Sequence, residues 1–333
     1  MRRDLVTGGA GFIGSHLVDG LIAAGDDVVV LDDFSAGNID NLTAARASGR
    51  LRIVDGSVLD PAAVDAAIGG CTHVFHMAIQ CVRRSLGRPL ENHEVNATGT
   101  LRLLEAARRH SVRRFLYCSS SEVYGNASAG ALDEAAAPCA PTTVYGAAKL
   151  AGELYALAYW RTYGLPVAIV RPFNAFGPRE HVAGDLAEVI PRFVARALNG
   201  EPPVIFGDGN QGRDFTFVAD TARGLRAAMA CDALVGHAVN LGHGRAITVR
   251  EVAAAVLRLC GRNDLTVRFA AGRPGDVHTL CAGTQRAREW LGFVPQVSFE
   301  DGLARYLAWF RAKYPDPGVL RDDPVVNWQM PPG

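Results

Sequence analysis

The sequence of 333 residues lacks an excess of charge of either sign and lacks a long apolar run. Lysine plus arginine and aspartate plus glutamate each number 34, so the formal net charge is zero. This balance argues against a dedicated nucleic-acid or membrane-surface protein. No run of eighteen apolar residues occurs, so we expect no membrane-spanning helix. The first expected strand leaves no room for a secretory signal before it, and we therefore expect a cytoplasmic protein.

Paired cysteine motifs and metal-binding histidine motifs are also missing. The chain has seven cysteines, an odd number, and no two have Cys-x-x-Cys spacing. We therefore expect reduced thiols rather than a disulfide framework. The histidines show no spacing typical of metal ligands, so we predict no metal site.

What the sequence does contain is an alternation of strand and helix patterns in its first half. Short apolar runs, typical of strands covered on both faces, alternate with longer segments rich in alanine and leucine. This order predicts an α/β fold with a doubly wound parallel sheet. The expected strands are 5–7, 27–31, 51–54, 73–76, 114–118 and 166–170, and the expected helices are 12–24, one starting at 60–61, 92–110 and 144–163.

A glycine-rich turn, Thr7–Gly14, connects the first strand to the first helix. Glycines in such a turn allow a tight bend and a close approach of the backbone to a pyrophosphate, which the N-terminus of the following helix attracts. Asp32 ends the second strand, 18 residues after Gly14. Its carboxylate can accept both ribose hydroxyls of NAD and would repel the 2′-phosphate of NADP. The predicted NAD-binding residues of this region are Gly8, Gly11, Phe12, Ile13, Gly14 and Asp32.

After residue 172 the pattern becomes less regular and prolines are frequent. We interpret 1–172 as a dinucleotide-binding domain with a returning part near 214–245. The segments 173–213 and 246–313 would form a smaller, interleaved substrate-binding lobe. The tail, 314–333, is expected to pack as an extended arm or to be partly disordered. Further expected elements are helices at 184–199, 218–231, 248–260 and 299–313 and a strand at 238–241.

Candidate catalytic residues follow the fifth strand and open a later helix. Ser120 and Glu122 come after strand 114–118, at the carboxyl end where parallel sheets bind ligands. Tyr145 and Lys149 are four residues apart, so they share one face of helix 144–163. A nearby ammonium and the positive nicotinamide ring both favour the phenolate. The pattern therefore predicts that Tyr145 is a base whose pKa Lys149 lowers.

These motifs, in this order, resemble the extended short-chain dehydrogenases/reductases, specifically the NAD-dependent nucleotide-sugar epimerases and dehydratases. The resemblance extends to about residue 313. The matching pieces are Thr7–Gly14, Asp32, 76–78, 96–100, 119–125, Tyr145 with Lys149, 171–174, 176–178, 207–215 and 273–276. It implies a Rossmann-type dinucleotide-binding domain, NAD as cofactor and a nucleotide sugar, such as a UDP-sugar, as substrate.

The resemblance also implies roles for single residues. Tyr145 would be the base and acid on the sugar 4-hydroxyl, and Ser120 would hydrogen-bond the same oxygen. Lys149 would tune Tyr145 and hold the nicotinamide ribose. Asn174 would contact the sugar or its diphosphate, and Arg213 and Arg273 would clamp the diphosphate with their guanidinium groups. Helices 92–110 and 144–163 would pair with those of a second subunit in a homodimer.

Glu122 divides the possible reactions within this family. In the resemblance, dehydratases use a glutamate here to remove the C5 proton, UDP-glucuronate decarboxylases carry one too, and many 4-epimerases do not. Ser121, however, stands where nucleoside-diphosphoglucose dehydratases commonly place an acidic aspartate, and 177–192 is more similar to 4-epimerases. We therefore favour a 4-epimerase, an isomerase, over a 4,6-dehydratase or a decarboxylase. A non-catalytic NAD-binding sensor is the alternative from another class, and the joint presence of Ser120, Tyr145 and Lys149 argues against it.

Overall fold

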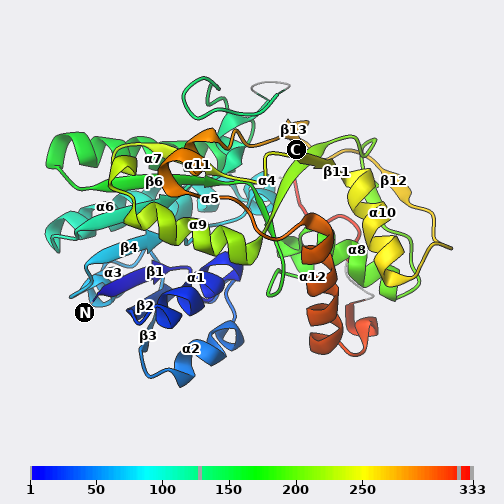
Figure 1. The fold of residues 1–333 in the computed structure, drawn as a ribbon, viewed down its shortest axis with the longest axis horizontal. Helices are drawn as coiled ribbons and strands as arrows, with labels where there is room; N and C mark the ends of the chain where they lie inside the picture. Colours follow the sequence, from blue (N-terminus) through cyan, green and yellow to red (C-terminus); the bar gives the residue numbers. More distant parts are fainter. Residues whose placement is uncertain (1, 127–129, 321–323, 331–333) are drawn as a thin grey trace.

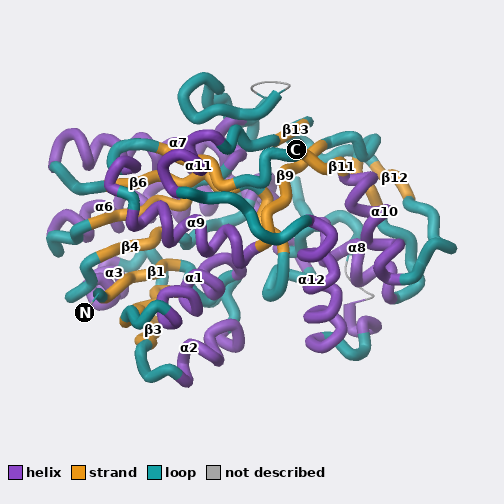
Figure 2. Tube along the Cα trace, viewed as in Figure 1, coloured by secondary structure: helices purple, strands orange, loops and turns teal. Residues whose placement is uncertain are grey.

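The computed structural model describes residues 2–126, 130–320 and 324–330, and its larger part is built on a seven-stranded parallel sheet (Figures 1 and 2). The strand order is β10-β6-β5-β4-β1-β2-β3. This confirms the predicted α/β fold with a doubly wound sheet. The strands are β1 (Arg3–Thr7), β2 (Asp27–Asp32), β3 (Leu51–Asp55), β4 (His73–His76), β5 (Arg114–Cys118), β6 (Val167–Pro172) and β10 (Ala238–Leu241).

Helices cover both faces of this sheet, which explains why its strands are largely apolar. Val28–Leu31 in β2, for example, is buried on both sides. One face packs against α1 (Phe12–Ala23), α2 (Thr43–Ala47), α9 (Val218–Ala230) and α11 (Gln285–Leu291). The other face packs against α3 (Pro61–Ile68), α6 (Gly99–Arg109) and α7 (Val144–Tyr163).

Local capping fixes the ends of two predicted helices. The side chain of Asp60 accepts a hydrogen bond from the backbone N–H of Ala62, with proline at the first helical position of α3. Thr143 caps α7 in the same way, and Gly164 ends it in a left-handed conformation. These caps confirm the predicted bounds of α7 and place Tyr145 in its first turn.

The helix predicted over 92–110 is present without a break, but it starts earlier than predicted and is not uniform. The chain forms α5 (Pro89–His93), a widened π-type turn η2 (Glu94–Thr98) and then α6. The turn coincides with Asn96, whose buried side chain donates to the carbonyl of Gln80 and accepts from the backbone N–H of Gln80. This contact comes from a distant loop, so a local pattern of apolar residues does not reveal it.

The predicted helix over 184–199 is wrong in its first turn. A short turn, η4 (Gly184–Leu186), is followed by an extended stretch, and α8 (Val189–Leu198) starts only after Glu188. Arg83 explains the break, because its guanidinium binds the carbonyl oxygens of Asp185 and Leu186. Because these two carbonyl oxygens accept from Arg83, they do not take part in the hydrogen bonds of α8.

A second group of elements forms a smaller lobe beside the sheet (Figure 1). Its core packs α8, α10 (Val249–Cys260) and α12 (Phe299–Lys313) against β9 (Gly212–Phe217). The other strands of this part are β7 (Asn174–Phe176), β8 (Val204–Phe206), β11 (Ala246–Thr248), β12 (Arg268–Ala270) and β13 (Thr279–Leu280). The remaining short helices are η1 (Ile39–Leu42), α4 (Val82–Gly87), η3 (Ser121–Tyr124), η5 (Asp232–Leu234) and η6 (Pro317–Leu320).

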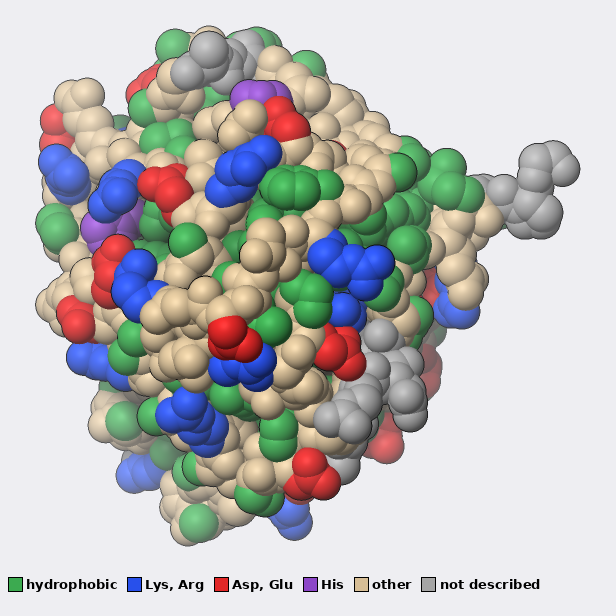
Figure 3. Space-filling view, turned by 90° about the vertical axis from the view of Figure 1, so that its right-hand side faces the viewer, with side chains coloured by type: hydrophobic (Ala, Val, Ile, Leu, Met, Phe, Trp, Pro, Cys, Tyr) green, Lys and Arg blue, Asp and Glu red, His purple; other side chains and the backbone are tan. Residues whose placement is uncertain are grey.

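The charged surface, the cysteines and the helices can each be compared with the expectations from the composition. Basic and acidic side chains are interspersed on the face of the smaller lobe (Figure 3). All seven cysteines are unpaired. Among the described residues, no helix is both long and apolar enough to cross a membrane.

Candidate active site

A cavity of about 470 Å³ opens at the carboxyl ends of β1, β2, β4 and β5. It is the crevice where an open parallel sheet is expected to bind its ligand. The predicted cofactor-binding residues Gly8, Gly11, Phe12, Ile13, Gly14 and Asp32 all line it. The structure therefore brings the glycine-rich turn and the acidic strand end together, and their contact with NAD stays a prediction.

Three of the four glycines of the turn, Gly8, Gly11 and Gly14, are needed for different reasons. A Cβ added at Gly8, which has φ +66°, would lie 2.8 Å from the Cα of Ala78. A Cβ at Gly14 would lie 2.1 Å from the carbonyl oxygen of Gly8. At Gly11 a Cβ would meet only that same oxygen, at 3.2 Å, and Gly11 lines the cavity. Gly8 and Gly14 are thus required by the fold itself, whereas Gly11 keeps a cradle open for a pyrophosphate.

Asp32 is oriented toward the cavity by two backbone N–H groups. Its Oδ2 accepts from Ala10 at 2.8 Å and its Oδ1 from Phe34 at 2.9 Å. Burial raises the pKa of the Asp32 carboxyl, and these two hydrogen bonds oppose that rise. Each carboxylate oxygen keeps acceptor capacity for a ribose hydroxyl. The acceptor oxygens of Asp32 at this end of the cavity therefore fit the ribose hydroxyls of NAD.

Ser120 and Tyr145 meet at another wall of the same cavity. Ser120 Oγ accepts from the backbone N–H of Glu122, which fixes η3 after β5, and the Ser120 side chain lies near enough to Tyr145 to influence its pKa. Lys149 lies one turn further along α7 but is only 1% exposed. Its Nζ donates to the carbonyl oxygen of Cys118 at 2.5 Å and lies 4.4 Å from the ring centroid of Tyr117. Its contact with a nicotinamide ribose stays a prediction.

We expected Lys149 to lower the pKa of Tyr145. The protein groups alone do not produce this effect, because the pKa of Tyr145 is raised. Burial raises the pKa of Tyr145 well above its ordinary value, and the side chain of Ser120 opposes this rise. Burial also lowers the pKa of Lys149 to about 8. The physical reason is desolvation, which disfavours the charged form of both groups. A phenolate at this site needs positive charge in addition to that of Lys149.

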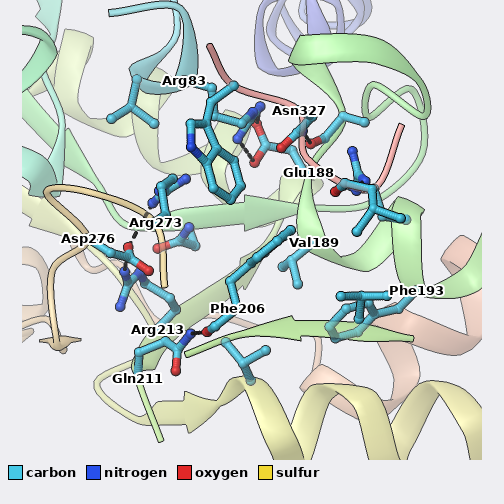
Figure 4. Close-up of a pocket in the computed structure, with 18 of the residues that line it drawn as sticks. Arg83, Glu188, Val189, Phe193, Phe206, Gln211, Arg213, Arg273, Asp276 and Asn327 are labelled. Atoms are coloured by element: carbon cyan, nitrogen blue, oxygen red, sulfur yellow. Dashed lines mark hydrogen bonds and ion pairs between the residues drawn. The ribbon is translucent and has the colours of Figure 1, made fainter. Parts of the chain in front are cut away.

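A second cavity, of about 170 Å³, holds the residues predicted to bind substrate (Figure 4). Asn174, Arg213 and Arg273 all line it, together with Glu122. Arg213 and Arg273 each donate to Asp276 Oδ1 at 2.7 Å, so both guanidinium groups gather on one side of the cavity. Two guanidinium groups against one carboxylate leave net positive charge there, which suits a diphosphate.

Glu122 is the carboxyl of this cavity that no cation holds by a hydrogen bond. Burial raises the pKa of Glu122, and the charges of Arg213 and Arg273 oppose that rise. Within the described part of the chain, its carboxylate has no hydrogen-bonded side-chain partner. Ser121, next to it, is buried at 4% exposure.

An ion pair that the sequence did not predict joins the two cavities. Arg83 donates to both carboxylate oxygens of Glu188, at 2.9 and 3.0 Å. Glu188 lines both cavities, and Arg83 holds its pKa low, against the effect of burial. No motif marks this pair, because its members lie 105 residues apart in the sequence. The tail residues Val325, Asn327 and Trp328 also line the second cavity, and no motif marks them either.

Comparison with known proteins places this geometry among related enzymes. Residues 5–242 match the model of the NAD dependent epimerase/dehydratase family. A dTDP-glucose 4,6-dehydratase of Streptomyces niveus is 37% identical over 317 residues, covering 93% of each chain. A UDP-glucose 4-epimerase of Mycolicibacterium smegmatis is 38% identical over 319 residues, covering 93% of this chain and 99% of the relative. The crystal structure of DesIV, a dTDP-glucose 4,6-dehydratase from Streptomyces venezuelae with NAD bound, is 37% identical with a TM-score of 0.88, covering 94% of this chain and 98% of that one.

Proposed function

Because this chain belongs to the NAD-dependent epimerase/dehydratase family, whose cofactor is NAD, we propose that it is a nucleotide-sugar 4-epimerase. The reaction would invert C4 of the sugar through a transient 4-keto sugar. The placement of Ser120 and Tyr145 together at one wall of the cofactor cavity supports oxidation at C4. What supports epimerisation in particular is the state of the carboxyl groups in the second cavity.

Three carboxyl groups line that second cavity, and two of them are committed to arginines. Glu188 is held by Arg83, and Asp276 by Arg213 and Arg273. Dehydration needs a base at C5 and also an acid for the departing hydroxyl, which amounts to two available groups. Among the described residues that line this cavity, Glu122 is the available carboxyl group, and Ser121 is no acid at neutral pH. Inversion at C4 needs neither a base at C5 nor an acid for a departing hydroxyl. The carboxyl groups of this cavity therefore favour the epimerase.

The chain's own residues would divide the work as follows. When bound, NAD⁺ supplies the hydride acceptor for C4 and the positive nicotinamide ring. Tyr145 would take the proton of the 4-hydroxyl at its phenol oxygen, and Ser120 would orient that hydroxyl. The carbonyl oxygen of Cys118 would fix the ammonium group of Lys149 near Tyr145 by accepting its hydrogen bond. Arg213 and Arg273 would bind the diphosphate, with Asn174 beside them, so that the sugar could turn while its anchor stays fixed.

Glu122 supports a second candidate reaction. A half-buried carboxyl with a raised pKa can take a proton and return it to a neighbouring carbon. Loss of carbon dioxide from a 4-keto hexuronate needs no acid on a departing hydroxyl, only proton return to C5. UDP-glucuronate decarboxylation is therefore the stronger alternative, and 4,6-dehydration, which needs a second acid, is the weaker one.

Turnover of UDP-glucose and UDP-glucuronate in D₂O separates these reactions. An epimerase that returns hydride to C4 leaves C5 bearing its original hydrogen. Deuterium at C5 of the product, detected by mass spectrometry and NMR, would contradict the epimerase and indicate proton transfer at C5. In that event Glu122→Gln should abolish the deuterium incorporation, which would identify Glu122 as the group responsible.

A non-catalytic NAD-binding sensor is distinguished by a simpler measurement. Adding nucleotide sugar to NAD-loaded protein should give NADH-like absorbance or fluorescence in an enzyme. A passive binder gives no such signal.

We also propose that two copies of the chain associate through α5, α6 and α7. Apolar side chains project from these helices, with Leu90 81%, Leu101 37% and Leu154 59% exposed. Burying them against a second copy would remove apolar surface from water. Sedimentation equilibrium of the wild type and of Leu154→Glu tests this proposal, and a monomeric wild type would contradict it.

A further inference from the structure

The last described segment, residues 324–330, crosses from the smaller lobe to the sheet domain, and we call it the C-terminal strap. At its start, Arg192 of α8 donates to the carbonyl oxygens of Pro324 and Val325, both at 2.6 Å. In the middle, Asn327 Nδ2 donates to the carbonyl oxygen of Ala187 at 2.9 Å. The strap has no helix or strand of its own, so these side-chain contacts with the chain fix its course.

At its far end the strap reaches α4, on the other side of the second cavity. The backbone of Gln329 passes close to Gly87, where an added Cβ would lie 2.8 Å from the carbonyl oxygen of Gln329. Asn327 is only 8% exposed and lies beside Glu188 and Arg83 (Figure 4). The strap is therefore built into the cavity wall.

The strap brings an aromatic side chain into that wall. The indole of Trp328 lies with its centroid 4.6 Å from the ring of Phe206, at 75°. Phe206 ends β8, and Gln211 fixes the turn that follows by donating to the carbonyl oxygen of Phe206 at 2.7 Å. Both aromatic residues line the same cavity as Arg213 and Arg273. One cavity thus offers two aromatic rings and, on another side, two guanidinium groups.

From this arrangement we propose that the C-terminal strap completes the nucleotide pocket, with Trp328 packing against the nucleobase together with Phe206. The inference rests on the proposed function in one respect, the use of a nucleoside diphosphate as the carrier of the sugar. The guanidinium groups match the diphosphate, and aromatic faces match the only other large planar group of such a ligand. The strap lies outside the residues that match the family model, 5–242.

The polar partners of the strap explain how a short extended segment can serve as a wall. Free movement of residues 324–330 would have to break the bonds from Arg192 and Asn327 together. Held in this way, Trp328 loses little further freedom when a base binds, which favours affinity. Stacking of a base on an aromatic side chain is strong enough that removing Trp328 should weaken binding about tenfold or more.

Isothermal titration calorimetry with UDP, dTDP, GDP and inorganic pyrophosphate tests the proposal on the full chain. In Trp328→Ala, the tightest-binding of the three nucleotides should bind about tenfold or more weakly, and pyrophosphate should bind as it does to the wild type. Trp328→Phe keeps an aromatic face and should retain most of the affinity. Asn327→Ala removes one anchor of the strap without removing the indole and should also weaken nucleotide binding.

Three outcomes would overturn the proposal. They are nucleotide affinity that is equal in Trp328→Ala and the wild type, an equal loss for nucleotide and pyrophosphate, and a wild type that binds none of the three nucleotides. Tryptophan fluorescence gives a second readout. Nucleotide should quench the wild type more than Trp328→Phe, and equal quenching in both would place the base away from Trp328. Because these measurements need no turnover, Trp328-dependent binding would stand even if the epimerase assignment failed.

Discussion

Burial keeps the proton on Tyr145, because an unprotonated phenol would place a negative charge in an apolar wall. The residue is therefore poised rather than active by itself. In the proposed reaction, its deprotonation would depend on positive charge that arrives with the oxidised cofactor. This dependence would couple proton removal from the sugar to the presence of NAD⁺, since neither Ser120 nor Lys149 alone overcomes the burial.

Tyr145→Phe should lower kcat by about 10²–10⁴-fold, because it removes the group that exchanges the proton with the 4-hydroxyl. NAD affinity should change little. Tyr155→Phe, on the same helix and half-buried, is the matched control. Steady-state kinetics and NAD titration check both variants, and near-normal turnover by Tyr145→Phe would refute its assigned role.

Asp4 shows that a charged residue inside a covered strand has a measurable cost. It is fully buried in β1, Arg2 Nε donates to its Oδ1 at 2.7 Å, and its Oδ2 has no partner among the described residues. Burial raises its pKa from 3.8 to about 6. A raised carboxyl pKa favours folding at low pH, and that contribution is lost as the pH rises from about 4 through 6.

Asp4→Asn should therefore stabilise the protein increasingly as the pH rises. Asparagine keeps an acceptor for Arg2 and carries no charge. Relative to the wild type, the variant should gain about 2–3 kcal/mol of unfolding free energy between pH 4 and pH 8. Denaturant unfolding of both proteins at the two pH values measures this gain, and a difference independent of pH would contradict it.

At the scale of elements, the strands of the sheet and the positions of Ser120 and Tyr145 could be predicted from the sequence. Strands covered on both faces are continuous apolar runs, and ligand-binding residues follow their carboxyl ends. The π-type turn within helix 92–110 could not be predicted, because it coincides with the contact of Asn96 with Gln80. The late start of α8 depends in the same way on Arg83, about a hundred residues earlier.

The glycine-rich turn allows a contrast between fold and cofactor. Gly11→Ala should change the melting temperature little, because its Cβ would meet only one atom, but should weaken NAD binding about tenfold or more by filling the cradle. Gly14→Ala should instead destabilise the fold by about 1–3 kcal/mol, because its Cβ would overlap the carbonyl of Gly8. Thermal unfolding and NAD titration distinguish the two. Equal effects of both variants on stability would contradict the separate roles.

At the scale of the whole molecule, the second cavity is assembled from segments that are distant in sequence. β9 pairs with β13, more than sixty residues later, and the C-terminal strap returns to α4 and α8. Local patterns contain no information on such pairing, which is why Arg83, Glu188 and Trp328 were not predicted. Arg213 and Arg273 were reached only through the family resemblance.

Arg83→Met should weaken the connection between the sheet domain and the lobe. It removes a bidentate partner from Glu188 and leaves the carbonyls of Asp185 and Leu186 without their donor. Because Glu188 faces the two cavities rather than a closed core, we expect a loss of about 1–3 kcal/mol in unfolding free energy and a higher KM for the sugar nucleotide. Arg84→Met, which removes a more exposed pair with Asp185, should cost less than about 1 kcal/mol. Equal losses in the two variants would contradict a specific role for Arg83.

The most direct test of the proposed function is proton NMR of the products formed with NAD and a panel of UDP-, dTDP- and GDP-sugars that includes UDP-glucuronate. We predict a sugar with inverted C4 and an unchanged C6, formed by the wild type and not by Tyr145→Phe. A 6-deoxy-4-keto sugar, or loss of C6 as carbon dioxide, would contradict the epimerase and make Glu122 the working base at C5.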